Sequence, residues 1–273
     1  MMRYTAERSA SHPPHTMDST MSNGTFFETA FEGLKKDGVQ PSMPLLLLVG
    51  GTDWRSLVTR AAQSTIRLDL QPSFWSQAAV LLEWAGALDS ACGLEVAFDP
   101  PEPARQVPER NGVTRFNLNR YLDGKQYPHL ALVGFRPGDV QQNPAAANID
   151  GTKIREAALS PNRERIRFPL WNYLGGWARY LYDTSACPNP LDNNVPHPGA
   201  SFCEYAFEAG GIDLNPNATG PQASPELFWA AAVHWAATQA LAGVETHLYC
   251  REGERHVFTR EALSPDLQSE FTP

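Results

Sequence analysis

Cysteines are few in this sequence, and none of them is close to another. The 273-residue chain has four, with no CxxC pair, at Cys92, Cys187, Cys203 and Cys250. Four widely spaced cysteines are too few for a disulfide framework in a chain of this length. We therefore expect the thiols to be reduced, which favours a cytoplasmic location.

Clustered basic residues and long apolar runs are also lacking. The chain has 22 Lys and Arg against 30 Asp and Glu, a formal net charge of −8. The only basic concentration, RERIRF at 163–168, is short, so we expect no nucleic-acid-binding surface. The apolar run MPLLLLVGG at 43–51 is far too short to span a bilayer, and the N-terminus lacks a charged-then-apolar signal pattern. The sequence thus predicts a soluble protein without a membrane span.

The composition is that of a globular protein with an N-terminal tail. Hydrophobic residues make up 42% of the chain and charged residues 19%, which is ordinary for a soluble domain. We expect residues 1–42 to be a disordered tail that contains one short amphipathic helix at 25–36. Docking of this helix on the body is favoured over a role as a partner-binding helix. Residues 43–273 are expected to form a single domain.

Strand patterns come first in this domain and helix patterns dominate later, which predicts an α+β fold. Strands are expected at 45–49, 75–84, 93–98 and 129–135. Helices are expected after the turn GGTDW, with Thr52 or Asp53 as cap, and at 151–159, 168–183 and 224–242. The last of these has Ser224 as N-cap and Pro225 at its first position, and a hairpin around Glu252-Gly253 closes the chain.

Neither a metal site nor a cofactor site is predicted. His247, Cys250 and His256 have the chemistry of metal ligands, but strand residues three apart point to opposite faces of a sheet. The turn VGGTDW resembles a phosphate loop only superficially, because it has neither GxGxxG nor GxxxxGK[ST]. We expect ordinary hairpin residues and a tight strand-to-helix turn instead.

Cys203 is the strongest candidate for chemistry, and its meaning depends on where its helix begins. If Ser201 is the N-cap and Glu204 completes a capping box, the thiol lies at the positive end of the helix, which favours a thiolate. If the helix begins near Pro198 and Gly199, Cys203 lies one turn inside, in an apolar stripe typical of core residues. Local patterns leave both registers open.

Three segments together resemble a known family. TDWRSLVTRAAQ, PSFWSQAAVLLEW and FCEYAFEAGGIDLNP…SPELF are similar to the circularly permuted NlpC-like, papain-like proteins, which include YiiX-type bacterial hydrolases and relatives of lecithin–retinol acyltransferase. The resemblance covers about residues 44–230. It implies a papain-like fold, with a small antiparallel sheet packed against helices. It also implies a base from a W-S-H element and a cysteine nucleophile at the start of a late helix.

The departures from the family pattern concern the catalytic positions themselves. The W-S-H element is Trp75-Ser76-Gln77 here, and glutamine cannot act as a general base near neutral pH. When the late helix is aligned on its apolar positions, Gly199 falls in the nucleophile position. His129, at the start of a neighbouring strand, is an alternative base, and His197 lies just before the helix.

Two functions are therefore expected from the sequence. In the first, a papain-like domain with degraded catalytic motifs acts as a binding or structural component that recognises a protein, peptide or acyl partner. Such a role predicts an apolar surface patch at the 25–38 helix or the 224–242 helix. In the second, an active cysteine hydrolase or acyltransferase uses Cys203 as nucleophile and His129 as base, with Gln77 or Glu95 as the orienting group.

Overall fold

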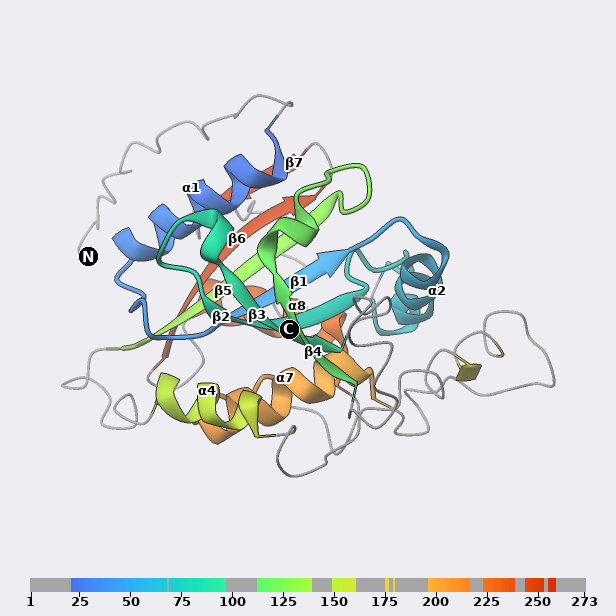
Figure 1. Ribbon diagram of the computed structural model, residues 1–273. Helices are drawn as coiled ribbons and strands as arrows, with labels where there is room; N and C mark the ends of the chain where they lie inside the picture. The colour runs from blue at the N-terminus through green and yellow to red at the C-terminus, as the bar shows by residue number, and fades with distance from the viewer. Residues whose placement is uncertain are drawn as a thin grey trace, which may run out of the picture.

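A seven-stranded antiparallel sheet forms the centre of the protein (Figure 1). This computed structural model describes residues 21–67, 69–96, 112–138, 149–160, 175–176, 179, 196–216, 223–238, 244–252 and 255–258. The first 20 residues of the tail predicted at 1–42, and most of the helix predicted at 168–183, lie outside these residues.

The strand order is β4-β3-β2-β1-β5-β6-β7, and every neighbouring pair is antiparallel. The strands are β1 (Leu45–Gly50), β2 (Gln77–Glu83), β3 (Cys92–Val96), β4 (Val113–Asn117), β5 (His129–Pro137), β6 (Val244–Glu252) and β7 (Arg255–Phe258). The central strand β1 and its neighbour β2 are buried along almost their whole length because helices cover both faces of the sheet.

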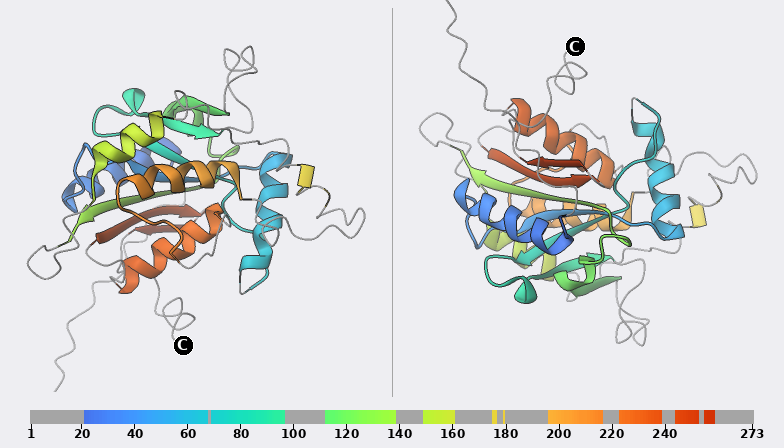
Figure 2. Two further views of the ribbon diagram at one scale, coloured as in Figure 1. Left: turned by 90° about the horizontal axis from the view of Figure 1, so that it is seen from below. Right: turned by 90° about the horizontal axis from the view of Figure 1, so that it is seen from above.

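Gly134 and Phe135 of β5 show which helices lie on which face of the sheet. They are consecutive strand residues, so they point to opposite faces. A Cβ built at Gly134 would meet Leu34 of α1, whereas the ring of Phe135 lies 5.6 Å from that of Phe207 on α7. The helices are α1 (Asn23–Lys36), α2 (Trp54–Ala62), α4 (Gly151–Leu159), α7 (Pro198–Ala209) and α8 (Pro225–Thr238). Helix α1 covers one face, and α4, α7 and α8 lie on the other (Figure 2).

Helix α1 is held on the sheet by its whole apolar stripe. Its N-cap Ser22 accepts from the amide of Thr25, and Phe26, Phe27 and Leu34 are completely buried. This contact leaves no apolar patch for a partner, so the predicted patch at the 25–38 helix is wrong. The described part of α8 is buried in the same way, apart from His234 and a few half-buried side chains.

Helix α2 lies at the end of the sheet where β1 finishes (Figure 1). Its cap is Asp53, whose carboxylate accepts from the amides of Arg55 and Ser56. Three short 3-10 helices complete the described elements, η1 (Gln63–Ile66), η2 (Leu88–Ser90) and η3 (Leu118–Tyr121). In the described part of the chain, no helix combines the length and the apolar character needed to cross a membrane.

Candidate functional site

Helix α7 begins at Pro198, with His197 as its N-cap. Of the two registers considered for Cys203, the second is therefore the observed one, and Ser201 is not the cap. Cys203 lies one turn inside the helix and is completely buried. Burial raises the pKa of its thiol well above the usual value, and the nearby charge of Glu95 acts in the same direction. This environment keeps the sulfur protonated, unlike that of a nucleophilic cysteine.

His129 begins β5 and does not pair with Cys203. It lies on the same side of the sheet as Phe135, and its ring is 5.0 Å from that of Phe74. Burial, together with the charges of Arg60 and Arg251, lowers the pKa of His129 to about 4. Within the described residues no hydrogen bond connects its imidazole to the thiol, and its Nδ1 has no hydrogen-bond partner.

Gln77 and Glu95 are brought together, but on the other side of the sheet. The Gln77 amide donates to the Glu95 carboxylate at 2.6 Å. Paired residues on neighbouring strands point to the same face, and Gln77 is paired with Val49, which is paired with Leu130. Leu130 is four residues before Gly134 on β5, so it points to the α1 face, and Gln77 does too. The sheet thus separates this pair from Cys203 on α7, so neither residue orients a catalytic imidazole there.

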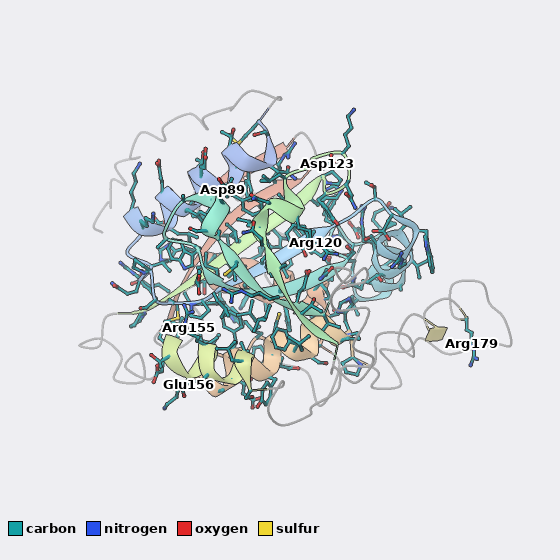
Figure 3. The ribbon with its side chains drawn as sticks, in the orientation of Figure 1. Asp89, Arg120, Asp123, Arg155, Glu156 and Arg179 are labelled. Atoms are coloured by element: carbon teal, nitrogen blue, oxygen red, sulfur yellow. The ribbon has the colours of Figure 1, made fainter. Side chains whose placement is uncertain are left out.

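Sequence reasoning missed two further members of the Glu95 cluster. The Tyr121 hydroxyl donates to the same carboxylate, and the Arg120 guanidinium lies 3.2 Å from its second oxygen. Arg120 is labelled in Figure 3. Burial raises the pKa of Glu95, whereas the positive charge of Arg120 and the hydrogen bonds from Tyr121 and Gln77 oppose that rise. The cluster is a fully buried carboxylate surrounded by donors, as is usual for buried polar groups.

Gly199, the alternative nucleophile position, is tightly packed. A Cβ at this position would lie 2.9 Å from the carbonyl oxygen of Ala78 and 3.3 Å from the ring of His197. The close approach of α7 to β2 therefore depends on glycine, and a cysteine side chain here requires a shift of the helix.

The imidazole of His197 is used entirely for structure. Its Nδ1 accepts from the amides of Gly199 at 3.1 Å and Ala200 at 3.3 Å, and its Nε2 lies 3.0 Å from the carbonyl oxygen of Ser76. Burial lowers its pKa to about 3, although the Ser76 carbonyl opposes this. Both nitrogens are occupied, so His197 is not a free base for the thiol.

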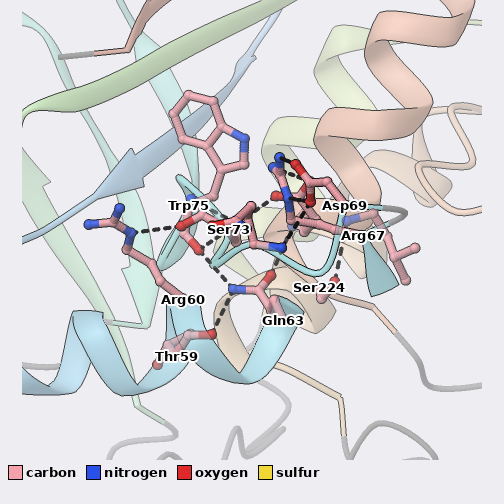
Figure 4. A network of polar contacts seen from close by, with 11 residues as sticks. Thr59, Arg60, Gln63, Arg67, Asp69, Ser73, Trp75 and Ser224 are labelled. Atoms are coloured by element: carbon pink, nitrogen blue, oxygen red, sulfur yellow. Dashed lines mark hydrogen bonds and ion pairs between the residues drawn. The ribbon is translucent and has the colours of Figure 1, made fainter. Parts of the chain in front are cut away.

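A second polar cluster joins the start of α8 to the segment before β2 (Figure 4). The Ser73 hydroxyl donates to Glu226 at 2.6 Å, and Arg67 pairs with the other oxygen of that carboxylate at 3.1 Å. The Gln63 amide donates to the Trp75 carbonyl and accepts from the amide of Glu226. These contacts anchor the two segments to each other.

Metal ligands do not converge in the described residues, where no group of three His, Cys, Asp or Glu side chains has metal-binding geometry. His247 is paired with Gly134 and Cys250 with Ala131, so the two side chains point to opposite faces. His247 instead lies 3.4 Å from Asp37 at the end of α1. The side chain of His256 lies outside the described residues.

Comparisons with known proteins add no family to this description. No protein-family model matches the chain, and neither a curated protein nor a solved structure matches it. The resemblance to NlpC-like proteins therefore stays a prediction from the sequence.

Proposed function

We propose that the chain is a papain-like domain of the permuted NlpC-like type that has lost catalysis and acts as a binding component for a protein partner. One observation carries the first half of this proposal: Cys203 is completely buried inside α7 and has no imidazole within hydrogen-bonding contact in the described residues. A cysteine hydrolase needs an accessible thiol next to a base. The antiparallel sheet with α7 packed on β2 is compatible with the papain-like part.

The thiol provides the first test. In the native chain we expect Cys203 to react with iodoacetamide at least about 100-fold more slowly than in the urea-unfolded chain, because reaction requires local opening. Peptide mass spectrometry assigns the rate to each cysteine. Hydrolysis of p-nitrophenyl acetate is expected to be equal for the native chain and Cys203→Ala. Preferential labelling of Cys203 among the four cysteines, or a turnover lost in Cys203→Ala, would refute the inactive domain.

Helix α2 supports the binding half of the proposal because its apolar side chains face outward. Its inner side is small or polar, with Ser56, Thr59 and Ala62 buried. Trp54 and Leu57, one turn apart on the outer side, are 59% and 51% exposed. Large apolar side chains on the outside of a helix whose inside is polar are typical of a contact surface.

The double variant Trp54→Ala, Leu57→Ser is expected to bind less 8-anilinonaphthalene-1-sulfonate, with fluorescence reduced by roughly half. The double variant removes two of the four large apolar side chains that are exposed among the residues that the structure describes. Its melting temperature should stay unchanged. Leu159→Ser on α4, which removes a single leucine of 39% exposure, is the matched control. Equal dye binding by the two variants would exclude α2 as the main apolar surface.

A further inference from the structure

His197 connects the start of α7 with three other parts of the fold. Its Nε2 contacts the Ser76 carbonyl before β2, and its backbone amide donates to Ala223, next to the start of α8. Ser76 in turn donates to the Val49 carbonyl and accepts from the amide of Gly51, which links this point to β1 and the turn into α2. The imidazole therefore joins the first turn of α7 directly to the segment that leads into β2.

Only one protonation state of the imidazole makes all of these bonds. Nδ1 must be unprotonated to accept from two backbone amides, while Nε2 must carry the proton that is donated to Ser76. A proton added to Nδ1 turns the acceptor into a donor that faces two other donors. It also places a positive charge at the positive end of a helix, in a completely buried site.

We propose that His197 is an acid-sensitive latch, whose protonation releases the first turn of α7 from β2. The released turn carries Gly199 away from the Ala78 carbonyl and uncovers the buried face on which Cys203 lies, one turn further along. The neutral imidazole holds the turn in place, and the cation cannot. This device does not depend on the proposed binding function, and it works whether or not the domain has a partner.

Charged groups around the first turn of α7 do not account for the lowered pKa of His197. Those on the surrounding elements are Arg55, Arg60 and the cap Asp53 of α2, Glu83 of β2, Glu95 of β3, His129 of β5, Glu204 and Glu208 of α7, and Glu226 of α8. None of them contributes to the pKa of His197, which burial alone lowers to about 3. Helix α4 packs at the opposite end of α7, where Ile154 lies against Gly210.

The acidic groups nearby have raised pKa values, so acid affects the stability of the fold there in the opposite direction from its effect at His197. Burial raises the pKa of Glu95 and Glu226, and burial and neighbouring carboxylates raise that of Glu204 to about 7. A carboxyl whose pKa is raised in the fold takes up its proton more readily there, so acid strengthens the fold at these sites. Acid weakens the fold at His197, where the pKa falls from 6.5 to about 3. The latch is thus fully closed above pH 6.5 and loosens about tenfold for each pH unit below it, until pH 3 is approached.

The test follows the labelling of Cys203 by 4,4′-dithiodipyridine in the full chain, relative to the unfolded chain at the same pH. Between pH 6.5 and about pH 4.5 we expect the relative rate to rise about 100-fold. In His197→Asn, which keeps an N-cap acceptor but does not titrate, the rise should be less than about threefold. His129→Gln, which removes a half-buried histidine on the same side of the sheet, should behave like the native chain.

Hydrogen exchange of the native chain supplies a second measurement that needs no variant. The amides of Gly199 and Ala200 should lose protection at acid pH while those of β1 and β5 keep it. A flat labelling profile in the native chain, an equal rise in His197→Asn, or loss of protection in β1 together with α7 would overturn the latch.

Discussion

Replacing Glu95 with alanine is expected to destabilise the fold by about 3–5 kcal/mol, as is usual when one partner of a buried ion pair is removed. The carboxylate accepts from Gln77 and Tyr121 and pairs with Arg120, and its side chain is completely buried. Alanine leaves the Gln77 amide and the Tyr121 hydroxyl without this buried acceptor, and it removes the negative charge that faces Arg120. Urea unfolding, with the slope held constant between variants, measures the loss.

Glu83 of β2 is the matched control. It also carries a carboxylate on the sheet and lies 3.7 Å from Arg115 and 3.8 Å from Arg155, but its side chain is 53% exposed. Exposed ion pairs of this kind contribute up to about 1 kcal/mol. The urea concentration at the midpoint of unfolding should therefore be nearly the same for Glu83→Ala as for the native chain. Glu95→Gln is expected between the two, because the amide keeps one acceptor for Tyr121 but no charge for Arg120. If Glu95→Ala and Glu83→Ala lose the same stability, the cluster does not stabilise the fold.

Most elements of the fold could be predicted because their signals are local. Helix α2 has its cap at Asp53, β1 is one continuous apolar run, and the hairpin of β6 and β7 turns at the predicted place. Strand β4, Val113–Asn117, was missed because it follows a proline-rich stretch and, among the described strands, pairs only with β3. An edge strand of five residues has no continuous apolar run to mark it.

The site was harder to predict because its contacts join residues that are far apart in the chain. Gln77 and Glu95 were both candidates, but their contact depends on the register of β2 against β3, which a bulge near Leu81 modifies. Tyr121 reaches the cluster from η3, and nothing local marks it. His197 precedes a proline that signals a helix start, yet histidine is not among the preferred caps, so its role depends on the Ser76 carbonyl, 121 residues away.

Replacing Gly50 with alanine is expected to cost about 3 kcal/mol or more, at the upper end of what overpacking costs. The added Cβ would lie 1.8 Å from the carbonyl oxygen of Phe74 and 2.8 Å from the Cβ of His129. Gly50 has no positive φ, so the demand for glycine comes from space alone. For a chain of this size the loss lowers Tm by roughly 6–12 °C, which calorimetry measures.

The segment around Phe74 has little freedom to move away, because Ser73 is bonded to Glu226 and the Ser76 amide donates to Val49 at 2.8 Å. Gly24→Ala is the control, since a Cβ there meets nothing closer than 3.7 Å and alanine favours a helix by up to about 1 kcal/mol. An unchanged Tm for Gly50→Ala would mean that the segment shifts at little cost. The polar cluster at the start of α8 would then not fix the segment before β2 against which His197 holds α7.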